Sequence, residues 1–248
     1  MENNETKTII EINNYSYENE INKLEAEIIP NTELDNLQID HTFKIVVLGN
    51  AGVGKSCLSL KGTKGIFEDS YKPTIAFDFF SFSAKIENKI IRLQIWDTCG
   101  QEEHRSLIQH LFHGAGLAII VYAINDIKSF NAISAWIKQL KNNSNPDVKL
   151  FLVRNKNDLK EERKISFEEG KKYSKDFEFF LFCETSAKTG INCQEIFLCA
   201  AKLLYLNFKN YQSGEIGKQT GKLTGNKKLG KNLVEKERKQ IKGYCWFI

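Results

Sequence analysis

Between an apolar run and a helical pattern, the sequence reads Gly49-Asn50-Ala51-Gly52-Val53-Gly54-Lys55-Ser56. This matches G-x-x-x-x-G-K-[ST] in the required context, because a strand pattern (Phe43–Leu48) precedes it and a helix pattern (Lys55–Lys61) follows. The glycines let backbone N–H groups turn inward around phosphates, and the helix start favours negative charge. We expect Lys55 to neutralise the β- and γ-phosphates and Ser56 to bind Mg²⁺, with Cys57 beside them. The motif predicts a bound nucleoside triphosphate and leaves the base open.

Outward from this loop, short apolar runs alternate with helical stretches, which predicts an α/β domain. A short connection, 87–89, predicts a hairpin between the second and third strands. We expect a six-stranded, mostly parallel sheet flanked by helices on both faces. The predicted strands are Phe43–Leu48, Phe77–Lys85, Ile90–Trp96, Leu117–Ala123, Lys149–Val153 and Glu178–Cys183. The predicted helices are Lys55–Lys61, Ser129–Lys141, Ser166–Lys175 and Ile191–Asn207.

Two further motifs follow apolar strands and indicate which base is bound. They read Asn155-Lys156-Asn157-Asp158 and Glu184-Thr185-Ser186-Ala187-Lys188. A carboxylate accepts hydrogen bonds from N1–H and the 2-amino group of guanine, a donor pair that adenine lacks, so we expect Asp158 to select guanine. Each motif alone is common in turns, but both stand at strand ends, where such sheets bind nucleotides. The expected base-binding set is Asn155, Lys156, Asp158, Ser186, Ala187 and Lys188.

The segment Leu93-Gln94-Ile95-Trp96-Asp97-Thr98-Cys99-Gly100-Gln101-Glu102 completes the expected chemistry. Asp97 ends a strand and is placed to hold Mg²⁺ through water, and Gly100 is placed to turn its amide toward a γ-phosphate. We expect Gln101 to orient the attacking water, since phosphoryl transfer depends on positioning and charge neutralisation. A kinase acting on a small metabolite remains an alternative that this order of motifs disfavours. Phosphate transfer to an acceptor other than water would revive it.

With these motifs in place, residues 43–208 resemble a Ras-superfamily GTPase domain. The Rab-like features are Thr74-Ile75-Ala76-Phe77-Asp78-Phe79, the segment ending at Glu102, and His113-Gly114-Ala115. The resemblance implies a P-loop NTPase G-domain that binds GTP or GDP with Mg²⁺ and hydrolyses GTP slowly, with Gln101, Lys55 and Thr74 as catalytic residues. It also implies that Thr74 binds Mg²⁺ and the γ-phosphate in the GTP state.

The same resemblance assigns roles to several apolar residues. It implies that Phe67 packs across the guanine ring. It implies an effector-binding surface of Ile75, Phe77 and Trp96, although Trp96 is equally compatible with a buried position. GTP is expected to order two switch segments, Phe67–Phe77 and Asp97–Leu107, and hydrolysis to release them.

Departures from the Rab pattern leave rival interpretations open. Ala51 is expected to crowd an arginine finger supplied by a Ras-type activator, and Cys99 replaces the usual Ala of its turn. Glu103-His104 replaces the common Arg-Phe pair, so a GTP-binding scaffold with negligible hydrolysis is one rival. Equal single-turnover hydrolysis by wild type and Gln101→Leu would favour it. A Ras-like signalling GTPase is the second alternative, while the absence of a Rho-type insert before Ser166 argues against a Rho-like protein.

The composition indicates the cellular environment of the chain, and two further segments are predicted on either side of the domain. The 248-residue chain is 42% hydrophobic and 27% charged, carries a formal charge of +4 and has six cysteines without a CxxC pair. That pattern is typical of reduced thiols in a cytosolic protein. We expect residues 1–41 to form a mostly disordered extension with a short helix around Ile21–Ile29, residues 42–208 to form the G-domain, and residues 209–248 to form a flexible basic tail.

The chain ends Cys245-Trp246-Phe247-Ile248, a C-a-a-X box whose middle residues are aromatic rather than aliphatic. Between Lys218 and Lys242 the tail holds nine Lys or Arg against two Glu. One lipid chain binds membranes only marginally, so this basic run supplies the second signal. We expect prenylation of Cys245, with geranylgeranyl favoured by the final Ile; the alternative is a solvated basic tail.

The sequence therefore predicts a monomeric GTP switch that directs vesicle traffic by recruiting effectors. Its expected partners are guanine nucleotide, an exchange factor, a GTPase-activating protein, a GDP-dissociation inhibitor or escort protein, and effectors, with no nucleic acid. Its expected location is the cytoplasmic face of intracellular membranes, with a cytosolic pool.

Overall fold

The fold is built on one sheet, whose strands follow the order β1-β8-β7-β6-β3-β5-β4-β2. The computed structural model describes residues 10–69, 73–100 and 108–213. Adjacent strands from β8 to β5 run parallel, whereas β4, β2 and β1 pair antiparallel with their neighbours. The bounds are β1 Ile10–Ile12, β2 Ala26–Ile29, β3 His41–Leu48, β4 Phe77–Ile86, β5 Lys89–Thr98, β6 Leu117–Ala123, β7 Lys149–Asn155 and β8 Leu181–Glu184. The predicted α/β sheet is confirmed, with eight strands in place of six.

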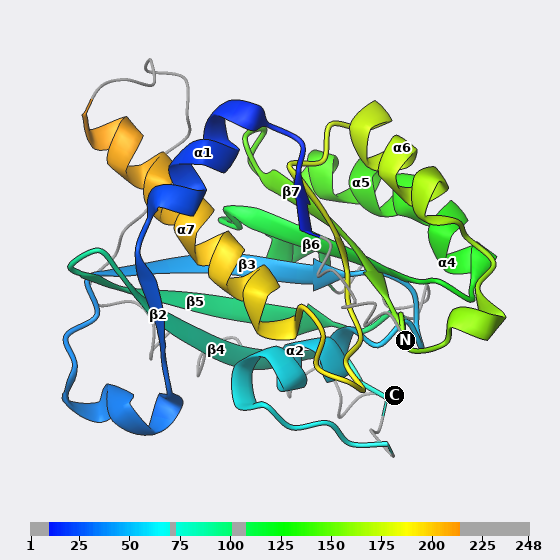
Figure 1. Ribbon diagram of the computed structural model, residues 1–248, viewed down its shortest axis with the longest axis horizontal. Coiled ribbons are helices and arrows are strands. Elements are labelled where there is room, and N and C mark those ends of the chain that lie inside the picture. Colours follow the sequence, from blue (N-terminus) through cyan, green and yellow to red (C-terminus); the bar gives the residue numbers. More distant parts are fainter. Residues whose placement is uncertain (1–9, 70–72, 101–107, 214–248) are drawn as a thin grey trace, which may run out of the picture.

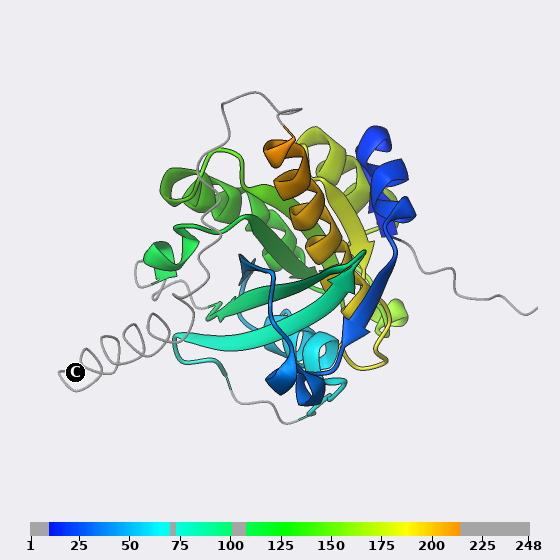
Figure 2. The same ribbon diagram turned by 90° about the vertical axis from the view of Figure 1, so that its left-hand side faces the viewer.

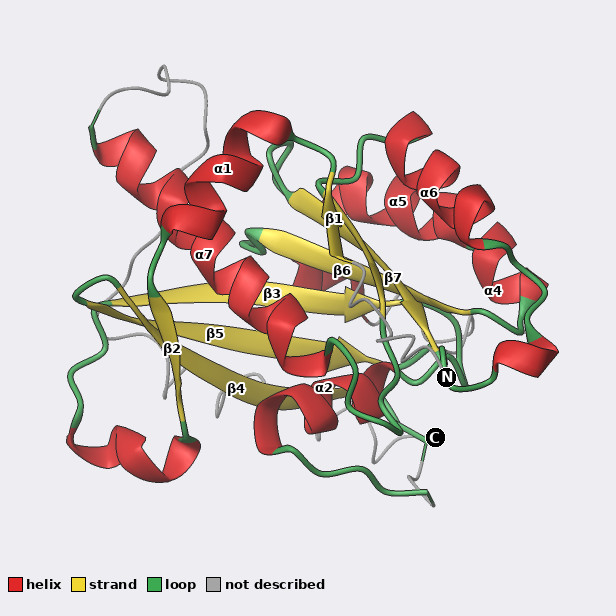
Figure 3. Cartoon of the chain, in the orientation of Figure 1, coloured by secondary structure: helices red, strands yellow, loops and turns green. Residues whose placement is uncertain are grey.

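Helices cover both faces of the sheet (Figures 1 and 3). The helices α1, α2 and α7 pack on one face, and α4, α5 and α6 pack on the other. The α-helical bounds are α1 Tyr15–Lys23, α2 Lys55–Lys64, α4 Ile127–Asn131, α5 Ile133–Asn143, α6 Phe167–Asp176 and α7 Cys193–Gln212. Short 3₁₀ turns are η1 Asn31–Asn36, η3 Gln109–Phe112 and η4 Lys160–Glu162.

The interior strands are apolar along their length because both of their faces are covered. In β3, Ile45 and Val47 belong to the core beneath α2 and α7, while Val46 and Leu48 belong to the core beneath α5. Side chains alternate between the faces of a strand, so a parallel strand buried on both sides reads as a continuous apolar run. This arrangement brings the polar ends of β3, β5, β7 and β8 to one edge of the sheet.

The N-terminal segment differs most from the sequence prediction. Within residues 10–41, β1 extends the sheet beyond β8, α1 packs against α7, and β2 extends the other side beyond β4, where it faces the viewer in Figure 2. The predicted helix around Ile21–Ile29 is wrong for its second half, which forms β2. Isolated helices as short as α1 are marginal in water. Contacts distant in sequence, such as those of the buried Ile21, stabilise the segment, and its local pattern does not reveal them.

Element boundaries also shift for local reasons. The strand predicted from Glu178 begins at Leu181, because Glu178 has φ +56° in the turn that ends α6. The single predicted helix 129–141 is two helices that meet at Ala132, and the first is capped by the Asp126 carboxylate, which accepts from the Lys128 N–H at 3.0 Å. The last helix runs to Gln212, one turn beyond the predicted end of the domain.

Candidate functional site

A cavity of about 540 Å³ opens at the carboxyl edge of the sheet. Its walls come from the loop before α2, the segment before β4, the end of β5 and the loops after β7 and β8. This is the edge at which open α/β sheets bind ligands. The lining residues are Ala51, Gly52, Gly54, Lys55, Ser56, Cys57, Phe67, Glu68, Asp69, Pro73, Thr74, Thr98, Gly100, Asn155, Lys156, Asp158, Leu159, Ala187 and Lys188.

The loop before α2 depends on its glycines. Gly49, Gly52 and Gly54 have φ of +139°, +77° and +91°, a region that other residues rarely adopt. A Cβ on Gly49 would lie 2.1 Å from the Val121 carbonyl oxygen, and one on Gly54 would lie 2.4 Å from Asn155 Nδ2. The loop therefore lies tightly against β6 and β7, and the predicted strand before it and helix after it are both confirmed.

Lys55 begins α2 and is only 5% exposed. Its Nζ donates to the carbonyl oxygens of Gly49 and Asn50, each at 2.9 Å. Burial lowers the pKa of this ammonium, while the nearby Asp97 acts in the opposite direction. A buried cation held by loop carbonyls at the cavity wall suits the phosphates of a nucleotide, since a charge-assisted contact is stronger away from water.

Three oxygen-bearing side chains meet at the same wall. Ser56 Oγ lies 2.8 Å from Thr74 Oγ1 and donates to Asp97 Oδ2. Asp97 is fully buried, burial raises its pKa to about 7, and its Oδ1 has no hydrogen-bond partner among the described residues. An orphaned buried carboxylate oxygen beside two hydroxyls fits a hard cation such as Mg²⁺, which favours oxygen ligands and retains water and phosphate ligands. When bound there, Mg²⁺ would supply neutralisation of phosphate charge.

The two loops predicted to bind the base are hydrogen-bonded to each other. Asn155 Oδ1 accepts from Thr185 Oγ1 at 3.0 Å and from the Ala187 N–H at 3.3 Å. Asn155 Nδ2 donates to the Val53 carbonyl at 2.9 Å, so the same side chain also holds the loop before α2. Ser186 Oγ donates to Asp158 Oδ1 at 2.6 Å, which orients that carboxylate at the cavity wall.

The structure brings most of the predicted site residues to this cavity. Gly49, Asn50, Val53 and Ser186 do not line it and instead support residues that do, and Asp97 lies behind Ser56. Gln101, the predicted water-orienting residue, and Cys245, the predicted lipid site, fall outside the described residues. The predicted residues that line the cavity are Ala51, Gly52, Gly54, Lys55, Ser56, Cys57, Phe67, Thr74, Gly100, Asn155, Lys156, Asp158, Ala187 and Lys188.

Five residues of the cavity wall, and one residue that holds a wall residue in place, were not predicted from the sequence. The missed wall residues are Glu68, Asp69, Pro73, Thr98 and Leu159. All of them adjoin predicted site segments in the chain, so proximity in sequence was the available signal. Thr185 does not line the cavity, but it fixes Asn155, and its position inside the second base motif was the signal for it.

An apolar surface continues from the metal-type site. Ile75, next to Thr74, is 81% exposed, and the half-buried Phe77 packs on Trp96 with ring centroids 5.2 Å apart. Trp96 itself is 3% exposed, so the structure favours its buried alternative over direct membership of the surface. Lys44 Nζ lies 4.8 Å from the centre of the Trp96 ring.

Gly100 connects the end of β5 to the glycine loop. Its carbonyl oxygen accepts from the Ala51 N–H at 3.0 Å, and a Cβ at Gly100 would lie 2.3 Å from that nitrogen. Only glycine permits this approach. Gly100 is therefore already in contact with the glycine loop, where a γ-phosphate would bind. The predicted turn of its amide toward that phosphate would start from this contact.

Fold and site together define a nucleoside-triphosphate-binding α/β domain, because the glycine loop joins a strand to a helix at the ligand-binding edge of a mostly parallel sheet. The model of the Ras family matches residues 44–205. The chain belongs to the Ras family. It is a Rab-like small GTPase, which binds GTP and GDP with Mg²⁺ and hydrolyses GTP.

Two curated relatives cover most of the domain. The chain is 37% identical to Ras-related protein Rab-13 of Rattus norvegicus over 179 residues, which are 72% of this chain and 88% of the relative. It is 40% identical to Ras-related protein Rab-11B of Dictyostelium discoideum over 178 residues, which are 71% of this chain and 80% of the relative.

In the part of the chain that the structure describes, none of the helices has the length and apolar character needed to cross a membrane.

Proposed function

We propose that this chain is a Rab-type switch that directs vesicle traffic by recruiting effectors to an intracellular membrane in its GTP state. The proposal rests on Thr74, the position at which the metal-type site adjoins an exposed apolar residue, here called the Thr74 junction. Its hydroxyl lies 2.8 Å from Ser56 Oγ in the metal-type site, and the next residue, Ile75, is the most exposed large apolar residue among those described. A nucleotide-dependent change at Thr74 would therefore move or order an apolar surface directly.

Residue roles follow from the geometry. We assign the phosphates to the loop from Gly49 to Ser56, with Lys55 as the neutralising cation, and guanine selection to Asp158 oriented by Ser186. Thr74 and Ser56 would bind Mg²⁺ directly and Asp97 through water. Gln101 would orient the attacking water, and Phe67, half-buried at the cavity wall, would pack on the base.

The membrane part of the proposal concerns residues beyond 213. A prenyl group on Cys245 and the basic run from Lys218 to Lys242 would together hold the chain on an anionic cytoplasmic leaflet. The two Rab relatives support this role. An exchange factor, a GTPase-activating protein and a GDP-dissociation inhibitor or escort protein would then control the membrane-bound and cytosolic pools.

Localisation of the tagged chain in cells tests this proposal. Wild type should appear as puncta, Cys245→Ser should be diffuse, and Ile75→Asp should reach the membrane without effector recruitment. Ile127→Asp is the matched control, because Ile127 is also exposed, at 48%, but starts α4 away from the Thr74 junction. Diffuse wild type, or puncta that persist in Cys245→Ser, would contradict the membrane role.

A further inference from the structure

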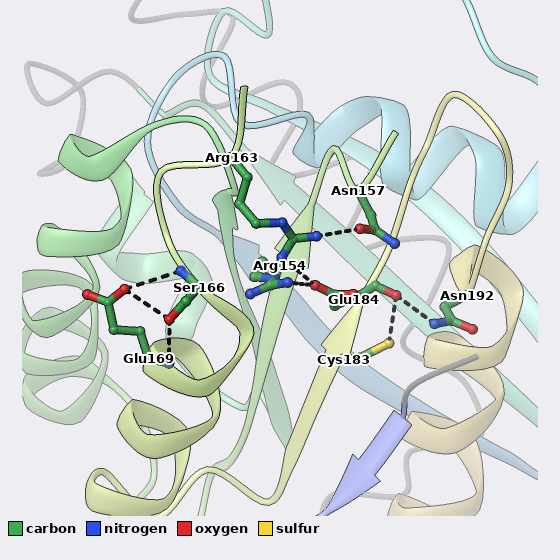
Figure 4. A network of polar contacts seen from close by, with 8 residues as sticks. All are labelled: Arg154, Asn157, Arg163, Ser166, Glu169, Cys183, Glu184 and Asn192. Carbon is green, nitrogen blue, oxygen red and sulfur yellow. Dashed lines mark hydrogen bonds and ion pairs between the residues drawn. The ribbon is translucent and has the colours of Figure 1, made fainter. Parts of the chain in front are cut away.

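A buried arginine lies directly behind the two loops of the proposed base site. Arg154 is in β7, one residue before Asn155, and its side chain is 0% exposed. Its guanidinium is ion-paired through Nη2 to Oε1 of Glu184, the residue opposite it on β8 (Figure 4). None of its three guanidinium nitrogens has a hydrogen-bond partner among the described residues, so the ion pair with Glu184 is the polar contact that holds Arg154 in place.

Glu184 is shared by a second arginine. Arg163 Nη1 donates to Glu184 Oε1 at 3.1 Å, and Arg163 Nη2 donates to Asn157 Oδ1 at 2.9 Å. Figure 4 shows the two guanidinium groups converging on this carboxylate. Glu184 ends β8 and begins one base motif, while Asn157 lies in the other. The network therefore joins the two loops from behind the cavity.

Backbone hydrogen bonds connect Arg154 to the two loops at the cavity. The Thr185 N–H donates to the Arg154 carbonyl at 2.8 Å, and the Asn157 N–H donates to the Thr185 carbonyl at 3.0 Å. From the other side, Asn192 Nδ2 donates to the Glu184 carbonyl at 2.6 Å. A displacement of Glu184 would thus displace Thr185 and, through it, the Asn155 amide and the backbone near Ala187.

Stability alone gives little reason for this arginine. Desolvation of a buried ion pair costs about as much as its attraction returns, and apolar replacements of such pairs are often neutral. A second guanidinium, that of the partly exposed Arg163, already balances the charge of Glu184. The Phe167 ring centre lies 5.4 Å from the Arg154 Cζ, so an apolar side chain of similar length would also find packing there.

We infer that Arg154 is a positioning residue for guanine recognition. Resting on the base site proposed above, it fixes Glu184 from the sheet side and thereby sets the spacing between the loop that carries Asp158 and the loop that carries Ala187. Removal of its charge leaves Glu184 free to follow Arg163, whose loop is more exposed. The base contacts then loosen, while Lys55 still donates to the carbonyls of Gly49 and Asn50 and holds that part of the glycine loop.

The test compares release of GDP and of inosine diphosphate (IDP) from the full chain with Mg²⁺ present. IDP lacks the 2-amino group that Asp158 is placed to accept from, so the ratio of the two release rates reports how well the base loops are positioned. In Arg154→Met we expect GDP release to accelerate roughly tenfold, about the loss of one buried charged contact. The preference for GDP over IDP should shrink by a similar factor. Arg154→Lys keeps the charge on a non-planar group, so its GDP release rate and its preference for GDP over IDP should lie between those of wild type and Arg154→Met.

Arg92→Met is the matched control. Arg92 is half-buried in β5, its Nε also has no hydrogen-bond partner among the described residues, and it pairs with Thr42 and Ser83 toward the opposite end of the sheet. The Arg92→Met variant should release GDP and IDP at the wild-type rates.

Wild-type release and preference in folded Arg154→Met would overturn the inference. So would equal acceleration for GDP and IDP together with a lower melting temperature, which a purely structural arginine would produce. If Arg154→Met does not fold, Arg154→Lys decides: a reduced preference supports the inference and a wild-type preference overturns it. Failure of wild type to bind GDP would instead contradict the proposed base site.

Discussion

The carboxyl edge of the sheet and its two outer strands are held together by different forces. The carboxyl edge is polar. Lys55 is buried against carbonyls, Asp97 has an oxygen without a hydrogen-bond partner in the described part of the chain, and Asn155 joins three segments by hydrogen bonds. The outer strands, β1 and β2, are held by backbone pairing. Between them in the chain, Ile21 of α1 and Leu24, which follows α1, are buried in the core beneath α7.

This difference separates function from stability. Buried polar groups at the carboxyl edge stabilise the fold little by themselves, because their desolvation offsets their attraction, and they gain partners when a charged ligand binds. Apolar contacts of α1 remove surface from water whether or not a ligand is present. Substitutions in the first region should change nucleotide binding, and substitutions in the second should change the free energy of unfolding.

Lys55→Met should have the largest effect and act on binding alone. Loss of a desolvated cation that faces phosphate should raise the dissociation constant for GDP about a thousandfold, or roughly 4 kcal/mol. Burial lowers the pKa of Lys55, so its charged form is disfavoured in the fold. The relief of this desolvation offsets the loss of the two hydrogen bonds from Lys55, so the melting temperature without nucleotide should change little. Titration with fluorescent GDP measures the dissociation constant, and thermal unfolding measures the melting temperature. A strongly lowered melting temperature would contradict the separation of nucleotide binding from stability.

Ile21→Ala should act on stability alone. Ile21 is 2% exposed in the core beneath α7, and truncation of such a side chain costs about 3 kcal/mol of unfolding free energy. Urea unfolding measures this loss, while the dissociation constant for GDP should remain that of wild type. Asn22→Ala, at the exposed neighbouring position, is the control. Unfolding free energies equal to wild type would mean that α1 contributes nothing to the domain.

Ser186→Ala should produce a smaller effect at the carboxyl edge. It removes the 2.6 Å hydrogen bond to Asp158 and leaves the carboxylate less well oriented. A hydrogen bond to a charged group contributes about 1.5 kcal/mol, so GDP affinity should fall roughly tenfold. Binding of GDP compared with IDP shows whether the loss lies in base recognition; an unchanged ratio would argue that Ser186 acts elsewhere.

Glu87→Gln should produce the smallest effect, on stability and dependent on pH. Glu87 accepts from Tyr205 Oη at 2.7 Å and is paired with Lys209 at 3.0 Å, and these contacts hold its pKa below the usual value. A lowered pKa in the folded state stabilises the fold above the unfolded-state pKa, and this contribution is lost as pH falls through the folded-state pKa. The variant should be slightly less stable than wild type at pH 7, and the difference should shrink below the ordinary glutamate pKa and vanish below the lowered folded-state pKa. Thermal unfolding across pH measures the difference, and a gap that persists in acid would exclude the charge as its cause.

The same division explains how far the sequence predicted the structure. Residues such as Gly54, Lys55 and Asp158 stand in motifs whose chemistry permits few alternatives, and the structure places all three at one cavity. The six strands from β3 to β8 were predicted because their apolar runs are long and bounded by turn residues.

The outer strands were not predicted, because β1 has three residues and β2 has four, and their pairing partners lie far away in the chain. Pairing across such distances leaves no local periodicity. No role was predicted for Arg154, which lies one residue beyond the predicted strand Lys149–Val153, because its partner Glu184 is adjacent only after β7 and β8 pair.

Nucleotide binding by the purified 248-residue chain tests the guanine site most directly. Competition of GDP, GTP and ATP for the site, measured with Mg²⁺ present, should show tight binding of GDP and GTP and none of ATP at matched concentrations. Asp158→Ala should lose most of the preference for guanine while it retains a folded domain. Binding of ATP as tightly as GTP, or of neither nucleotide, would contradict the assignment of the carboxyl edge as a guanine-nucleotide switch.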